Sequence, residues 1–202
     1  MTERAAALLL AALVALLPAI GCGGSSVSVS SSVAQLTNPF LGPEHSDWLV
    51  GPISRMATLQ EIQQYLAIQD DQQAAAFIAA FWDRRDPAAD KPGNPVRETF
   101  DQRSAEADRL YGEAGFGGHR TDRGVIYVLY GAPEKVDFDI SPVAGGPPIE
   151  VWTYEARSPS GLDGKRPGGL YRFIKKGDLT VLYFPGVGSQ PMLPQVQPPD
   201  RP

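Results

Sequence analysis

A glycine-rich, polar stretch near the middle of the chain holds the residue types best suited to chemistry. Within residues 115–124, His119 is followed three positions later by Asp122. A histidine can serve as a general base, and a neighbouring carboxylate can orient its ring. One hypothesis is therefore a hydrolase in which His119 is the base and Asp122 or Asp86 is its partner. The alternative is a structural turn, in which Thr121 and Asp122 accept backbone N–H groups.

Other components of an active site are missing from the sequence. No nucleophile elbow is present, and the single cysteine, Cys22, lies far from this stretch. His45 and His119 have neither paired spacing nor an adjoining ligand cluster, so we predict no metal site. The glycine-rich segments match neither a P-loop nor a dinucleotide fingerprint, so we expect no nucleotide and no cofactor. Eighteen basic against 23 acidic residues, a net charge of -5, give no electrostatic footprint for nucleic acid.

A further class of function is ligand binding through exposed aromatic rings. Trp152 and Tyr154 alternate along a predicted strand and share a face with Glu150. Aromatic faces stack on sugars and close apolar interfaces, so these two residues form the predicted platform for a cell-wall glycan or peptide. Trp82 recurs at helical spacing with Phe81 and Phe77 and is assigned to the core instead.

The first half of the chain carries helix-start signals that would position these groups. Thr58 and Glu61 have the spacing of a capping box, in which each side chain satisfies a backbone N–H group of the other residue. Asp70 starts a second helix, and Asn94 with Pro95 starts a third. Apolar residues then recur every three or four positions, so we expect three amphipathic helices in this half.

The second half changes to strand signals. Segments rich in β-branched and aromatic residues lie at residues 125–130, 135–140, 149–156, 170–174 and 179–184. The last two flank Lys175–Asp178, a predicted hairpin turn in which Gly177 supplies the positive φ. Helices first and strands afterwards predict an α+β fold, with N-terminal helices packed on a small, mostly antiparallel β-sheet.

The first residues have the form of an export signal. An unbroken apolar run covers residues 5–20 and is followed at once by a glycine and Cys22. Residues 19–22, Ala-Ile-Gly-Cys, resemble the bacterial lipobox, whose cysteine receives a diacylglycerol. We predict a lipoprotein signal peptide over residues 1–21 and membrane attachment through a lipid on Cys22. A cleaved secretory signal with a spare thiol is the alternative.

Composition divides the rest of the chain into three parts. Residues 22–45 are predicted to be a flexible Gly- and Ser-rich tether, residues 46–186 an α+β domain, and residues 187–202 a disordered proline-rich tail. Gly23, rather than Asp, follows the cysteine, which resembles lipoproteins sorted to the outer membrane. The predicted location is therefore the bacterial outer membrane, with the domain facing the periplasm or the cell surface.

The glycine-rich stretch and its surroundings resemble a known family. Residues 118–124, Gly-His-Arg-Thr-Asp-Arg-Gly, are similar to the motif of the GWxTD domain family, named for Gly-Trp-x-Thr-Asp. The matching residues are Gly118, Thr121, Asp122, Arg123 and Gly124, followed by Tyr130, Gly131 and Pro133, with Trp82, Arg84 and Asp86 upstream and Glu150, Trp152 and Tyr154 downstream. His119 stands where the motif has tryptophan. The resemblance implies a bacterial envelope protein and assigns no reaction.

The interpretation that needs the fewest assumptions is a non-catalytic envelope module that binds a protein partner or scaffolds an assembly. Under it, one ion-pair and hydrogen-bond network locks the Arg-Asp-Pro corner to the Thr-Asp turn. Its predicted members are Arg84, Arg85, Asp86, Asp122 and Arg123. The glycan- or peptide-binding module and the hydrolase are the alternatives.

Overall fold

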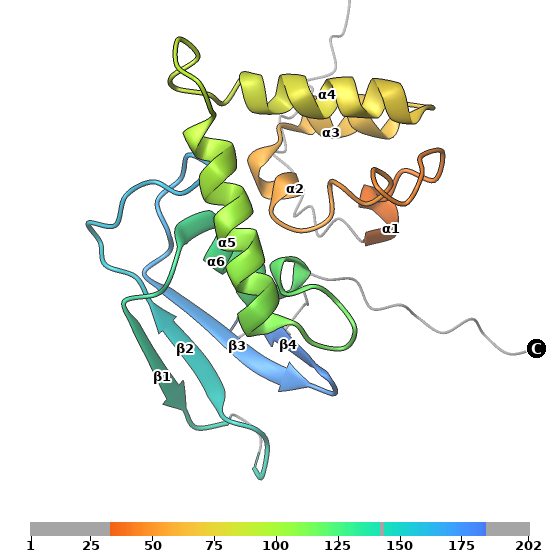
Figure 1. The fold of residues 1–202 in the computed structure, drawn as a ribbon. Helices are drawn as coiled ribbons and strands as arrows, with labels where there is room; N and C mark the ends of the chain where they lie inside the picture. The colour runs from red at the N-terminus through yellow and green to blue at the C-terminus, as the bar shows by residue number, and fades with distance from the viewer. Residues whose placement is uncertain (1–32, 142–143, 185–202) are drawn as a thin grey trace, which may run out of the picture.

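The computed structural model describes residues 33–141 and 144–184, which form helices followed by a four-stranded sheet (Figure 1). The helices are α1 (Val33–Leu36), α2 (Ile53–Met56), α3 (Leu59–Leu66), α4 (Asp71–Asp83), α5 (Pro95–Tyr111) and α6 (Asp122–Tyr130), with a 3-10 turn, η1 (Gly118–Arg120), before α6. The strands are β1 (Lys135–Asp139), β2 (Ile149–Thr153), β3 (Leu170–Lys176) and β4 (Leu179–Leu182). The predicted α+β fold is confirmed.

The three helix starts lie where the capping residues predict them. Thr58 and Glu61 form the reciprocal capping box at the start of α3. Asp70 accepts the backbone N–H of Gln73 at the start of α4. Asn94 accepts two backbone N–H groups at the start of α5. Within the described ranges, no helix combines the length and apolar character needed to cross a membrane.

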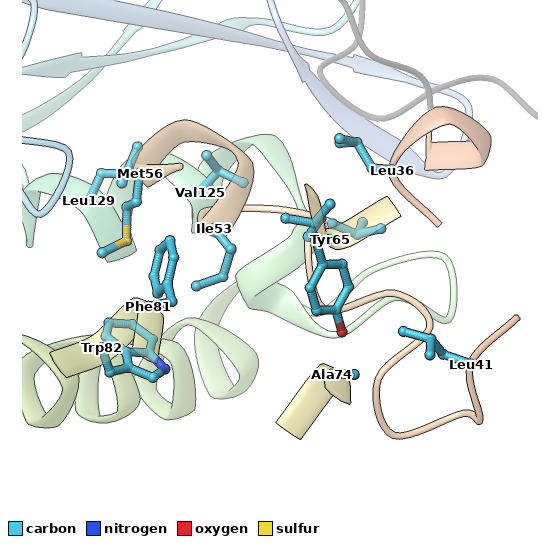
Figure 2. Packing of buried hydrophobic residues seen from close by; sticks show 12 residues of the cluster. Leu36, Leu41, Ile53, Met56, Tyr65, Ala74, Phe81, Trp82, Val125 and Leu129 are labelled. Carbon is cyan, nitrogen blue, oxygen red and sulfur yellow. The ribbon is translucent and has the colours of Figure 1, made fainter. Parts of the chain in front are cut away.

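The helical half encloses a core rich in aromatic rings. The ring of Trp48 lies 4.8 Å from that of Tyr65 and 4.9 Å from that of Phe81, centroid to centroid. Trp82 packs edge-on against Phe81 at 5.2 Å. Figure 2 shows the buried members of this core, among them Tyr65, Phe81 and Trp82, together with Leu129, which α6 contributes to the same cluster. Each large apolar side chain buried in this way contributes about 1.5–3 kcal/mol.

The folded region begins earlier than residue 46. Leu36 and Leu41 are buried in the helical core, and the buried Asn38 donates its side-chain amide to the carbonyls of Tyr65 and Ile68 at 2.9 Å. Because these contacts fix the chain, the prediction of a tether as far as residue 45 is wrong for residues 33–45. The predicted signal peptide, residues 22–32 and the proline-rich tail lie outside the described residues.

The four strands form an antiparallel meander in the order β1-β2-β3-β4, so β1 and β4 are its edges. The strands predicted at residues 135–140, 149–156, 170–174 and 179–184 are confirmed. The predicted hairpin turn joins β3 to β4, and Gly177 has a φ of 58° there. The helices lie on one side of the sheet (Figure 1).

The segment 125–130 is a helix, and the prediction of a strand there is wrong. It forms most of α6, whose buried residues include Val125 and Leu129 on the side of the helical core and Ile126 on the side of the sheet. A short helix enclosed on both sides is apolar all round, so its sequence has no clear period. The decisive local signal is Thr121, which caps the first turn.

Candidate functional site

The two glycines of the motif allow three backbone segments to touch. A Cβ atom on Gly118 would overlap the carbonyl group of Ala107 in α5. A Cβ atom on Gly124 would overlap the carbonyl group of Gly118. The backbones of α5, η1 and α6 are therefore stacked directly on one another, which any larger residue would prevent.

Thr121 connects η1 to α6. Its side chain is fully buried, and its hydroxyl donates to the carbonyl of Gly118 at 2.8 Å. The same hydroxyl oxygen accepts the backbone N–H of Gly124 at 3.1 Å. Thr121 is thus the N-cap of α6, and the prediction that it accepts a backbone N–H group is confirmed.

Asp122 joins α6 to the far edge of the sheet. The residue is 1% exposed, and its carboxylate oxygen Oδ2 accepts the backbone N–H of Leu182 in β4 at 2.6 Å. Tyr183 donates its own backbone N–H to Arg172 in β3. Backbone groups alternate in direction along a strand, so the N–H of Leu182 points away from β3, toward the outer edge. The carboxylate of Asp122 takes the place of a neighbouring strand at this position.

Glu113 closes the same edge two residues earlier. One of its carboxylate oxygens accepts the backbone N–H of Thr180 at 2.9 Å, and the other accepts the hydroxyl of Thr180 at 2.8 Å. The outward N–H groups of Thr180 and Leu182 are therefore both bound to carboxylates, the partly buried one of Glu113 and the buried one of Asp122. Exposed edge strands can pair with other chains, and covering an edge prevents this. The Thr-Asp motif and Glu113 close the β4 edge.

Arg123 connects Glu113 to β2. Its guanidinium lies 3.1 Å from the carboxylate of Glu113 and 3.2 Å from that of Glu150. Glu150 in turn accepts the indole N–H of Trp152 at 2.7 Å. The guanidinium also lies 5.4 Å from the ring centre of Tyr111. We refer to Glu113, Asp122, Arg123 and Glu150 as the joint cluster, because it ties the helices to β2 and β4.

His119 lies beside this cluster and pairs with a residue that the sequence did not indicate. Its ring nitrogen Nδ1 is 2.6 Å from the carboxylate of Asp108, and the same carboxylate accepts its backbone N–H at 2.9 Å. Its other ring nitrogen, Nε2, accepts from Arg120 at 3.2 Å. In the neutral tautomer that satisfies both contacts, the proton is on Nδ1. Burial raises the pKa of Asp108, but the hydrogen bonds from His119 outweigh it and the pKa lies below its usual value.

The pairings proposed for a hydrolase are therefore wrong. The carboxylate of Asp122 binds the backbone of Leu182, and that of Asp86 accepts the backbone N–H of Ala88 at 2.9 Å. His119 pairs instead with Asp108, and Arg120 occupies the nitrogen that a general base would use. The guanidinium of Arg120 is itself paired with Asp47.

The Arg-Asp-Pro corner belongs to a separate cluster. Arg85 donates to both carboxylate oxygens of Glu61, at 3.0 and 2.7 Å, and its guanidinium lies 3.6 Å from the ring centre of Phe81. Arg84 adds a third contact to Glu61 at 2.9 Å. Hydrogen bonding from Arg85 is the main cause that lowers the pKa of Glu61 to about 2. The prediction of one network from Arg84 to Arg123 is wrong, since this cluster and the joint cluster are distinct.

Residues 130–133 form the exit from α6. Gly131 ends the helix with a φ of 83°, a conformation that favours glycine. The hydroxyl of Tyr130 donates to Asp163 at 2.9 Å, and Pro133 is half-buried just before β1. The guanidinium of Arg103 donates to the carbonyls of residues 128 and 129 at 3.1 Å, which satisfies the end of the helix.

The aromatic platform predicted on β2 is buried. Trp152 is 1% exposed and Tyr154 5% exposed, because their face of the strand is the one that the helices cover. The hydroxyl of Tyr154 donates to the carbonyl of Gly131 at 2.8 Å, and burial raises the pKa of Tyr154 well above its usual value. These two residues belong to the core, and the prediction of an exposed platform is wrong.

Several residues of the site carry no signal in the sequence. Glu113, Asp108 and Arg103 lie in or just after an ordinary amphipathic helix, and their partners are distant along the chain.

Within residues 33–141 and 144–184, no three His, Cys, Asp or Glu side chains gather in a way that could hold a metal ion.

The fold and the joint define an α+β domain in which a Gly-x-x-Thr-Asp motif fastens a helical half to an antiparallel sheet. The model of the GWxTD domain matches residues 25–162, and the chain belongs to this family. The matched region contains the helical half, the motif, β1 and β2, and it ends before β3. Neither the curated proteins nor the solved structures contain a match to the chain.

Proposed function

We propose that this protein is a lipid-anchored component of the bacterial cell envelope whose GWxTD domain is a non-catalytic interaction or scaffolding module. The observation that carries the proposal is the use of the motif itself. Thr121 and Asp122 are buried, and their oxygens bind backbone groups of η1, α6 and β4. Polar groups committed to backbone in this way hold a surface in shape, which is what a binding module requires.

The anchor is supported by the sequence alone. The apolar run at residues 5–20 leads directly into Cys22, and residues 33–36 already belong to the domain. A short connecting segment would then hold the domain close to the bilayer. Acyl chains on one cysteine supply stable attachment, since each buried methylene contributes about 0.8 kcal/mol. The proposed location is the outer membrane.

Membrane fractionation of Cys22→Ser tests the anchor. We expect the wild-type chain in the membrane fraction and the variant in the soluble fraction, with equal melting temperatures for the folded domain. Membrane attachment that survives the substitution would refute the lipid anchor. Crosslinking of intact envelopes followed by mass spectrometry then identifies the partner of the domain.

A substitution at His119 tests the non-catalytic role against the hydrolase. His119→Gln keeps a hydrogen-bonding side chain at a partly exposed position, so we expect normal folding and a normal cellular phenotype. A variant that melts as the wild type does but abolishes the phenotype would favour catalysis. Asp108→Asn serves as the matched variant, because Asp108 is the partner of His119 in this structure.

A further inference from the structure

The two edge strands of the sheet, β4 and β1, differ in whether other residues bind their outward backbone groups. At β4, the carboxylates of Glu113 and Asp122 bind the outward N–H groups. At the other edge, the carbonyl of Thr153 in β2 accepts the backbone N–H of Glu134, so the backbone groups of Thr153 point toward β1. Alternation then directs the backbone groups of Val136 and Phe138 outward. In Figure 1 no described helix or strand covers this outer side of β1.

The side chains of β1 make this edge suitable for pairing. Val136 and Phe138 alternate along one face of β1, and Ile140 follows the strand directly; these side chains are 46%, 67% and 94% exposed. The strand lacks the proline or bulge that commonly protects an edge, and its protection consists of charged residues only. An open edge with a row of apolar side chains binds a further strand through backbone hydrogen bonds and alternate side-chain contacts.

We propose that β1 pairs in antiparallel fashion with β1 of a second copy of this chain, about a two-fold axis at Asp137. In this register Lys135 lies opposite the partner's Asp139, and Val136 lies opposite the partner's Phe138. Both contacts occur twice because of the symmetry. The outward backbone groups of Val136 and Phe138 then exchange N–H···O bonds across the axis. The inference deepens the proposed interaction role and rests on it.

Charge and apolar contact together select this register over its neighbours. An axis at Phe138 would place Asp137 opposite the partner's Asp139 twice, and like charges facing each other oppose pairing. An axis at Val136 would pair Lys135 with the partner's Asp137, but it would place Phe138 opposite the partner's Glu134 and leave that large ring without an apolar partner. The chosen register places Asp137 directly opposite its own copy, but Lys135 lies 2.8 Å from Asp137 within each chain and offsets its charge.

Cysteine crosslinking in the full-length chain tests the register. The backbone N–H and C=O groups of residues 135, 137 and 139 point toward β2. Across the two-fold axis these residues therefore form non-hydrogen-bonded pairs, whose Cα atoms are about 4.5 Å apart. This separation suits a disulfide. We expect Asp137→Cys to crosslink to itself. Lys135→Cys and Asp139→Cys should each form no disulfide crosslink alone and should crosslink when the two variants are mixed. The wild-type chain, with Cys22 as its single cysteine, gives the background.

Sedimentation of the purified chain gives a second test, because it measures the dimer directly. The variants change the charge or the size of side chains on β1. Phe138→Glu should abolish the dimer, whereas the matched Phe40→Glu, at a position 65% exposed away from the strand, should leave it intact. Asp137→Asn should strengthen association. Lys135→Asp should weaken it, and adding Asp139→Lys should restore it by exchanging the two opposed charges.

Two outcomes would overturn the proposal. One is the absence of a crosslink at Asp137→Cys above the wild-type background. The other is self-crosslinking at Val136→Cys or Phe138→Cys in its place, which would mean a different register. Fractionation of the same cells reports on the membrane anchor separately, and envelope crosslinking reports on other partners. A failure of strand pairing is thus distinguishable from a failure of the proposed function.

Discussion

The carboxylate of Asp122 lies 2.6 Å from the backbone nitrogen of Leu182, which is 60 residues later in the chain. This contact joins the first turn of α6 to the outer edge of β4. Together with the pair formed by Glu113 and Thr180, it closes one edge of the sheet from the helical side. The motif that identifies the family thereby holds the helical half of the domain against the sheet.

Replacement of Asp122 should destabilise the domain. Asp122→Ala removes the acceptor for a buried N–H group, and a hydrogen bond to a charged group contributes about 1.5–3 kcal/mol. We expect the free energy of unfolding to fall by about 2 kcal/mol, measured by urea denaturation. Asp122→Asn retains an acceptor oxygen and should lose less. Equal stability of Asp122→Ala and the wild type would show that the contact is dispensable.

The glycines of the motif should not tolerate a methyl group. In Gly118→Ala and Gly124→Ala the new Cβ would overlap backbone carbonyls, and such overpacking costs about 1–3 kcal/mol or more. Gly169→Ala is the matched control, because a Cβ there meets no atom within 4 Å. Thermal melting should show a large drop for the first two variants and little change for the control. A similar melting temperature in all three would contradict the stacked arrangement.

The two arginines of the Arg-Asp-Pro corner should differ in importance. The side chain of Arg85 is 18% exposed and binds both oxygens of Glu61, whereas that of Arg84 is 49% exposed and makes one contact. Removing a buried partner leaves a charge uncompensated, while exposed ion pairs contribute about 0–1 kcal/mol. Arg85→Ala should therefore lose far more stability than Arg84→Ala in chemical denaturation. The reverse order would exclude the assigned geometry.

Glu61 should make the domain sensitive to acid. Its pKa is lowered from 4.5 to about 2, so its contribution to stability is complete above pH 4.5 and is lost as the pH falls toward 2. Glu61→Gln should be less stable than the wild type at neutral pH. The difference in free energy of unfolding between them should shrink across that window. A difference that stays constant with pH would mean that the carboxylate is not held in its charged form.

The sequence predicts those parts of the fold that are decided locally. The starts of α3, α4 and α5 follow from Thr58, Asp70 and Asn94, because capping depends on residues two or three positions apart. The hairpin at Gly177 is local in the same sense. The prediction of a strand at residues 125–130 is wrong because burial on both sides removes the apolar period that distinguishes a helix from a strand.

The sequence predicts which residues belong to the candidate site, but it does not predict the residues to which they bind. The sequence predicts Thr121 and Asp122 as acceptors of backbone groups, and Thr121 acts within its own turn. The partner of Asp122, in contrast, is set by the tertiary packing of β4 against α6. His119 likewise pairs with Asp108, which is eleven residues earlier in α5 and has no sequence feature of its own.

Amide hydrogen exchange at Leu182 is the most direct test of the fastening role. Tyr183 is the internal reference, because its N–H binds β3 and not the motif. In the wild type we expect the outward N–H of Leu182 to be protected although it lies on an edge strand. In Asp122→Ala, the protection of Leu182 should fall by more than that of Tyr183. Equal changes at both amides, or none at Leu182, would contradict the central claim that Asp122 closes the β4 edge.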